Sequence, residues 1–137
     1  MDGVSMTTLS KQGIIKRLVE DGNYDGYCNS EITDENYPTK DTGVFVYKII
    51  HGSEIGDGCV YRKDVEKKFK ELGLRLPTAA EALYIFTKTP RDQWLCAFIS
   101  GSRGAFIVFE DGGQRNLLLY SGDGDWYADY DFVGVCE

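Results

Sequence analysis

The chain has 137 residues, the usual size of one domain, and we expect residues 1–137 to form a single domain. Hydrophobic residues make up 42% of the sequence and charged residues 27%, proportions of a globular protein that exclude collagenous, coiled-coil and disordered classes. The net charge of −7 argues against direct nucleic-acid binding, because neutralising phosphates requires an excess of Lys and Arg.

The first third of the sequence predicts a helix, an acidic loop and a strand. Residues 11–20 place apolar side chains at helical spacing behind Ser10, a good N-cap, and predict the helix. Residues 21–42 are rich in Asp, Asn, Gly and Ser and predict the loop. The β-branched and aromatic side chains of residues 43–50 predict the strand.

The centre of the sequence predicts two further helices. Residues 62–72 have an apolar face typical of a helix, and Gly73 is placed to end it. Thr78 and Glu81 have the spacing of a capping box, in which each side chain accepts a hydrogen bond from the backbone amide of the other. We therefore expect the third helix to begin at Thr78.

The last third predicts short strands connected by turns. The expected strands are residues 94–100, 105–110, 116–121 and 132–136. Asp111-Gly112-Gly113 is a hairpin signal between the second and third of them. Two or three helices followed by a strand meander predict an α+β fold with an antiparallel sheet. In this interpretation residues 43–137 form the core, and residues 1–42 add a helix and an acidic loop.

The negative charge is concentrated in two blocks. Residues 18–42 carry seven acidic side chains against Lys40, and residues 110–137 carry seven against Arg115, so each block has a net charge of −6. A solvated surface explains such blocks; a cation site, or a face that binds a basic partner, is the alternative.

The first acidic block contains a candidate calcium site. Asp21, Asn23 and Asp25 have the spacing of the first half of an EF-hand loop, where alternate residues supply oxygen ligands. Ile32 stands where that loop has its bidentate Glu, so the ligand set is incomplete. A turn rich in Asn and Asp is the alternative.

The second acidic block contains a second candidate calcium site. Its four aspartates are Asp123, Asp125, Asp129 and Asp131. Calcium binds several hard oxygen ligands on a flexible loop, and this spacing permits such an arrangement without requiring it. A solvated loop with Asx turns is the alternative, in which case the chain has no cofactor.

Aromatic side chains are interleaved with these aspartates. They are Tyr120, Trp126, Tyr127 and Tyr130. Tyr and Trp combine a large contact area with a polar group and are enriched at recognition surfaces, which predicts a ligand-binding surface here. The alternative is that Trp126 and one of the tyrosines complete the hydrophobic core.

We expect no enzymatic activity. The single histidine, His51, lies between a predicted strand and a glycine and is interpreted as an exposed turn residue. The sequence contains no nucleophile elbow and no phosphate-binding loop. The cysteines include no CxxC pair, which argues against a zinc site and indicates reduced, buried thiols; they are Cys28, Cys59, Cys96 and Cys136.

No segment of the sequence predicts membrane association. Apolar runs such as residues 105–109 are far shorter than the ~20 residues that cross a bilayer. The first ten residues lack the charged and apolar regions of a signal peptide. We therefore expect a cytoplasmic location, with a virion-associated location as the alternative.

Two segments together resemble a known family. Leu72-Gly73, Arg75-Leu76-Pro77-Thr78 and Glu81 match an LG-x-RLPT-x-xE signature, and Trp126-Tyr127-Ala128-Asp129 precedes a terminal strand ending in Cys136-Glu137. The sequence is similar to bacterial C-type-lectin-like domains of the formylglycine-generating-enzyme type. The resemblance implies a lectin-like scaffold with calcium near the second acidic block. The sequence lacks the Glu-Pro-Asn sugar-binding tripeptide, so the resemblance implies a scaffold more than an activity.

These observations lead to two functional hypotheses. The first is a non-catalytic binding module that recognises a protein or a glycan through the aromatic and acidic residues 120–131. The second is a small acidic inhibitor or adaptor of the phage or mobile-element type, which occupies a basic, nucleic-acid-binding groove of a partner protein. The oligomeric state is open in both.

Overall fold

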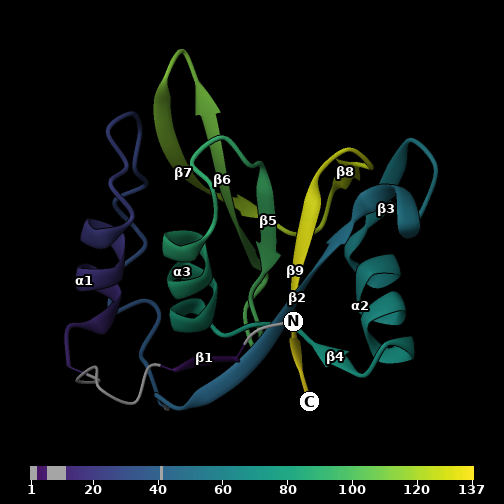
Figure 1. Ribbon diagram of the computed structural model, residues 1–137, viewed down its shortest axis with the longest axis horizontal. Helices are drawn as coiled ribbons and strands as arrows, with labels where there is room; N and C mark the ends of the chain where they lie inside the picture. Colours follow the sequence, from purple (N-terminus) through teal and green to yellow (C-terminus); the bar gives the residue numbers. More distant parts are fainter. Residues whose placement is uncertain (1–2, 6–11, 41) are drawn as a thin grey trace.

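Three α-helices and two β-sheets make up the part of the chain that the computed structural model describes, residues 3–5, 12–40 and 42–137 (Figure 1). The larger sheet is mostly antiparallel, so the predicted α+β fold class is confirmed. The helices are α1 (Ile14–Asp21), α2 (Arg62–Glu71) and α3 (Ala79–Lys88), with a short 3₁₀ turn, η1 (Gly52–Glu54). The strands are β1 (Gly3–Ser5), β2 (Val44–His51), β3 (Cys59–Tyr61), β4 (Leu74–Arg75), β5 (Leu95–Phe98), β6 (Gly104–Asp111), β7 (Gln114–Ser121), β8 (Asp125–Tyr127) and β9 (Asp131–Cys136).

The larger sheet has the strand order β1-β2-β9-β5-β6-β7, with β4 as a further partner of β9. Strands β5, β6 and β7 are antiparallel neighbours in chain order and form the predicted meander. Strand β9 returns to the other edge of β5 and runs parallel to it, while pairing antiparallel with β2. The C-terminal strand is therefore central, and Phe132 lies between Ile50 and Cys96.

Strands β3 and β8 form a separate two-stranded sheet, in which Val60 lies opposite Trp126. Neither strand was expected, because three residues are too few to show an alternating pattern. The pairing nevertheless decides where the second acidic block lies, since it fixes β8 against the segment that leads into α2.

Each face of the larger sheet has its own hydrophobic core. Side chains of a strand alternate between the two faces, so Leu95 and Ala97 of β5 lie in one core and Cys96 and Phe98 in the other. Helices α1 and α3 cover the first face, while α2 and the β3–β8 sheet cover the second (Figure 1). We call these the α1–α3 face and the α2 face.

Helix α1 contributes Ile14, Ile15 and Leu18 to the core of the α1–α3 face. The expected cap Ser10 and the expected first helical residue lie outside the described residues, and Gly13 is the N-cap of the described helix. Asp34 supplies the capping oxygens, accepting hydrogen bonds from the amides of Ile15 at 3.0 Å and Lys16 at 3.2 Å. Part of the first acidic block therefore has a structural role.

Helix α3 begins as predicted. Thr78 Oγ1 accepts a hydrogen bond from the Glu81 amide at 3.2 Å, and Glu81 Oε1 accepts one from the Thr78 amide at 2.9 Å, so the capping box is confirmed. The Arg75 guanidinium also donates two hydrogen bonds to Glu81, at 2.8 and 2.9 Å. The start of α3 is thereby joined to β4 and, through β4, to the central strand.

The hairpin predicted at Asp111-Gly112-Gly113 is also confirmed. Asp111 pairs with Gln114, which leaves a two-residue loop between β6 and β7. Gly112 and Gly113 have φ angles of 61° and 82°, and a type I′ turn requires positive φ at both positions. Glycine adopts this conformation without the steric cost that a Cβ would add.

Candidate functional site

The four aromatic residues predicted to bind a ligand form one connected cluster. The ring of Trp126 lies 6.3 Å from that of Tyr120 and 6.2 Å from that of Tyr130, and the rings of Tyr127 and Tyr130 are stacked at 6.4 Å. Tyr120 comes from β7, Trp126 and Tyr127 from β8, and Tyr130 from the turn before β9. The fold thus gathers the cluster on the α2 face, beside the β3–β8 sheet.

Two of these residues are exposed and one is not. The exposed fraction is 68% for Tyr127 and 52% for Tyr120, but only 8% for Trp126. The expectation that Trp126 contacts a ligand is therefore wrong for this structure, because its ring packs edge-on against Phe98 at 5.6 Å within the hydrophobic core. Trp126 packs between the core and the cluster, and Tyr120 and Tyr127 form the exposed side of the cluster.

Trp94 belongs to the cluster, although the sequence did not indicate it. Its ring lies 5.9 Å from Tyr130 and 5.2 Å from Phe109, and 46% of the residue is exposed. Trp94 precedes β5 in the chain and reaches the others only because β9 returns to the edge of β5. We call Trp94, Tyr120, Tyr127 and Tyr130 the aromatic surface.

The four aspartates of the second acidic block do not gather into a metal site. Asp123 accepts a hydrogen bond from Arg103 at 2.9 Å, and Asp125 accepts one from the thiol of Cys59 at 3.5 Å. Asp131 accepts one from Gln93 at 3.0 Å. Asp129 is exposed and joins none of these pairs. The carboxylates are thus dispersed along the rim of the aromatic surface.

In the candidate EF-hand loop of the first block, several oxygen atoms accept hydrogen bonds from the protein itself. Asp25 Oδ1 accepts hydrogen bonds from the Arg115 amide at 2.8 Å and from Arg91 at 2.9 Å, and the carbonyl of Asn23 accepts another from Arg91 at 3.0 Å. The Arg115 amide, then the Arg91 guanidinium, hold the pKa of Asp25 below its usual range. The Arg91 guanidinium therefore donates hydrogen bonds to oxygen atoms of Asn23 and Asp25. Among the described residues, Asp21 is not one of its hydrogen-bond partners.

Across the described residues, no three His, Cys, Asp or Glu side chains are grouped in a way that could hold a metal ion. The arrangement gives no support to a calcium site at Asp21, Asn23 and Asp25 or at the four aspartates on the rim, and both calcium sites stay predictions. Calcium requires several oxygen ligands converging at about 2.4 Å, and here each carboxylate has a separate protein partner or is solvated.

The thiols differ in burial, and the histidine has a structural role. Cys96 is fully buried, which raises the pKa of its thiol, and the hydrogen bond to Asp125 raises the pKa of exposed Cys59. The expectation of four buried thiols is therefore wrong for Cys59, while Cys28 and Cys136 are partly buried. His51 is exposed as predicted. Its Nδ1 accepts a hydrogen bond from the Ser53 amide, and His51 thereby caps η1.

Comparisons with protein-family models, with curated proteins and with solved structures give no match to this chain. The similarity to C-type-lectin-like domains thus stays a prediction. Of the helices in the described part of the chain, none has the length and apolar character needed to cross a bilayer.

Proposed function

We propose that the chain is a non-catalytic binding module that recognises a basic segment of a partner protein through the aromatic surface. The observation that carries this proposal is the exposure of Trp94, Tyr120 and Tyr127 within a single ring cluster. Leaving large aromatic side chains in water forgoes the free energy of burying them. Trp and Tyr are also the residues that most often anchor protein interfaces.

The charge around the aromatic surface favours a cationic partner. Asp125 and Asp129 are exposed on either side of Tyr127 in the sequence, and neither forms an ion pair within the described residues. An Arg or Lys side chain lying over the rings gains a cation–π attraction, and neighbouring carboxylates add to it. A neutral glycan could also stack on the rings, but it would leave these charges unpaired.

The cluster has the rigidity that a binding surface needs. Trp126 packs perpendicular to Phe98, and Phe98 is stacked on Phe132 of the central strand at 5.8 Å. The exposed rings are thus supported by the core of the α2 face and lose little freedom on binding. Preorganisation of this kind lowers the entropic cost of association.

The test is binding of the purified chain to arrays of short basic, neutral and acidic peptides and to a glycan array. We expect basic peptides to bind, more weakly as salt is raised. Tyr127→Ala should weaken that binding about tenfold, because an exposed interface tyrosine is removed.

Tyr27→Ala is the matched control, since Tyr27 is 56% exposed but belongs to the loop after α1. It should leave binding unchanged. Equal loss in the two variants, or no preference for basic peptides, would contradict the proposal. Binding to glycans alone would keep the surface but replace the ligand class.

The inhibitor hypothesis gains no specific support from the arrangement of charge. The first acidic block lies on α1 and the loop after it, over the α1–α3 face, whereas the second extends from the β6–β7 hairpin to the end of the chain (Figure 1). A mimic of nucleic acid needs one continuous acidic surface. The hypothesis stays a prediction, and only one of the two blocks at a time could serve it.

A further inference from the structure

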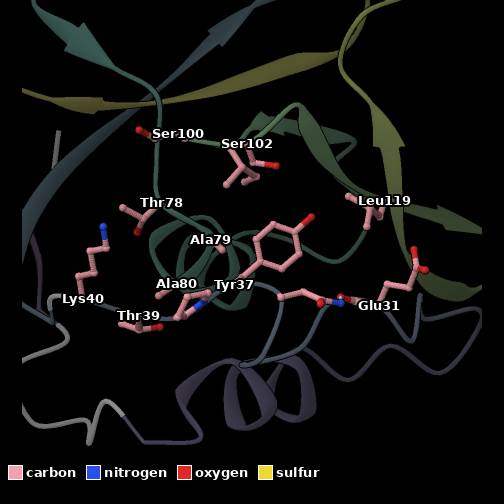
Figure 2. A pocket seen from close by; sticks show the side chains of 14 residues that line it. Glu31, Tyr37, Thr39, Lys40, Thr78, Ala79, Ala80, Ser100, Ser102 and Leu119 are labelled. Atoms are coloured by element: carbon pink, nitrogen blue, oxygen red, sulfur yellow. The ribbon is translucent and has the colours of Figure 1, made fainter.

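A cavity of about 700 Å³ lies on the α1–α3 face (Figure 2). A shallower hollow shares Tyr37 and Leu119 with it and extends to Tyr120 of the aromatic surface. Its walls are the loop of residues 31–40, the start of α3 at Thr78–Ala80, the turn Ile99–Ser102 and Leu119 of β7. Sites for small organic molecules usually measure about 300–1,000 Å³. The four walls are distant in sequence, so the fold itself forms the cavity.

The middle of the cavity is a fixed aromatic ring. Tyr37 packs edge-on against Phe106 of the sheet, with ring centroids 5.0 Å apart. Ile99 and Leu119 add apolar walls. A flat, apolar group entering the cavity would find a preorganised surface to stack on.

One end of the cavity contains a polar group without a partner. Thr39 Oγ1 is buried, and it forms no hydrogen bond within the described part of the chain. A buried hydroxyl in this state destabilises the fold unless something satisfies it. Less than 1 Å² of this oxygen is exposed, so a polar atom of a bound molecule could supply the missing bond only after the Thr39 side chain rotates toward the cavity that it lines.

Among the described residues that line the cavity, the one cation, Lys40, lies at this same end. Figure 2 shows Lys40 beside Thr39 and Thr78, with Glu31 on the other side of Tyr37. The capping box satisfies the amides of Thr78 and Glu81, whereas helix α3 itself offers no acceptor for its first amides, those of Ala79 and Ala80. Because Arg75 neutralises Glu81, that carboxylate does not oppose an anion here.

We propose that this cavity binds a small organic acid, with its anionic group at the Thr39–Lys40 end and its flat apolar body against Tyr37. Carboxylates and phosphates share the chemistry that this end recognises. Their oxygen atoms accept hydrogen bonds from an ammonium group, a hydroxyl group and backbone amides. This site does not depend on the aromatic surface, so either one can fail while the other stands.

The test is a ¹H–¹⁵N NMR titration of the full chain with phenyl phosphate, benzoate and benzyl alcohol. We expect both anions to shift the amide signals of Thr39, Lys40, Ala79 and Ala80, and the stronger of the two identifies the acid class. Benzyl alcohol, which keeps the ring but lacks the charge, should shift them at least about tenfold less at equal concentration.

Two variants separate the contributions. Lys40→Met removes an exposed charge and should weaken anion binding about tenfold, while Lys48→Met, an exposed lysine on β2, should not. Thr39→Val removes the unsatisfied hydroxyl, so it should weaken binding without lowering the melting temperature. The proposal is overturned if no anion shifts these signals at millimolar concentration, if benzyl alcohol matches the anions, or if Lys40→Met and Lys48→Met behave alike.

Discussion

Arg115 is a buried cation, 3% exposed, that has no carboxylate partner among the described residues. Its guanidinium donates to the carbonyl of Gly22 at 3.2 Å and to that of Phe86 at 2.7 Å, and it lies 5.4 Å from the ring centre of Tyr24. Both carbonyls are at helix C-terminal ends, where the helix dipole is negative. The ends of α1 and α3 therefore replace the missing counter-ion, and Arg115 holds both helices to β7.

Replacing this side chain tests that role. Arg115→Ala should lower the free energy of unfolding by about 3 kcal/mol, because two charge-assisted hydrogen bonds are lost and two carbonyls are left without this donor. Urea denaturation of the variant and the wild type measures the difference. Arg103→Ala is the control, since Arg103 is 87% exposed on its side chain and its pair with Asp123 should contribute less than about 1 kcal/mol. Equal losses of unfolding free energy in the two variants would refute the role of Arg115 in holding α1 and α3 to β7.

At the scale of the element, the start of α3 is an acid-sensitive junction. Burial alone would raise the pKa of Glu81, but hydrogen bonds from Arg75 and Thr78 outweigh it and hold that pKa below its usual range. A carboxyl with a lower pKa in the folded state stabilises the fold above its unfolded pKa, about 4.3. That contribution is lost as pH falls through the folded pKa.

We therefore expect the melting temperature to fall as pH drops below about 4.3, and the Glu81→Gln variant to lose less over the same range. At neutral pH the variant should be about 1–2 kcal/mol less stable, since the Arg75 pair is partly exposed. Calorimetry across pH measures both effects. Glu66→Gln provides the control, because Glu66 is exposed and pairs with Arg62 within α2. If the melting temperature of Glu81→Gln falls at low pH as much as that of the wild type, other carboxyls, such as Asp25, govern the acid sensitivity.

The elements that local chemistry specifies were predictable, and those that long-range pairing specifies were not. The Thr78–Glu81 capping box and the Gly112–Gly113 turn need only a few adjacent residues, and both are confirmed. Strands β3 and β8 exist only because they pair with each other, and no periodicity marks three residues. The central place of β9 depends on contacts with β2 and β5, which composition does not encode.

The same distinction holds for the aromatic surface. Tyr120, Tyr127 and Tyr130 were predicted together because they are close in sequence, whereas Trp94 joins them only through the sheet. The aspartates on the rim were predicted to converge because they too are close in sequence. Short spacing permits convergence on a loop, but partners such as Arg103 and Gln93 draw the carboxylates apart instead.

At the scale of the whole molecule, the sheet separates two layers with different chemistry. The α2 face presents exposed rings and unpaired carboxylates, and the α1–α3 face contains the cavity beside Lys40. The two proposed ligands would therefore bind on opposite faces of one sheet. Strand β9 runs through both cores, since Val133 and Val135 lie in one and Phe132 in the other. This shared strand makes the stability of each layer depend on the other.

The dependence of the fold on its N-terminal segment follows from the same architecture. Ile14, Ile15, Leu18 and Ile32 are at most 5% exposed and pack in the core with α3 and the sheet. Burying each such side chain stabilises a fold by about 1.5–3 kcal/mol, so the four together match the whole net stability of a typical domain. We expect a fragment of residues 43–137 to lack cooperative unfolding and to give a poorly dispersed NMR spectrum. Adding a synthetic peptide of residues 12–42 in trans should restore dispersion, because it supplies the missing apolar face. A fragment that unfolds cooperatively without the peptide would instead show that residues 43–137 fold on their own and that the N-terminal segment is an addition to a complete core.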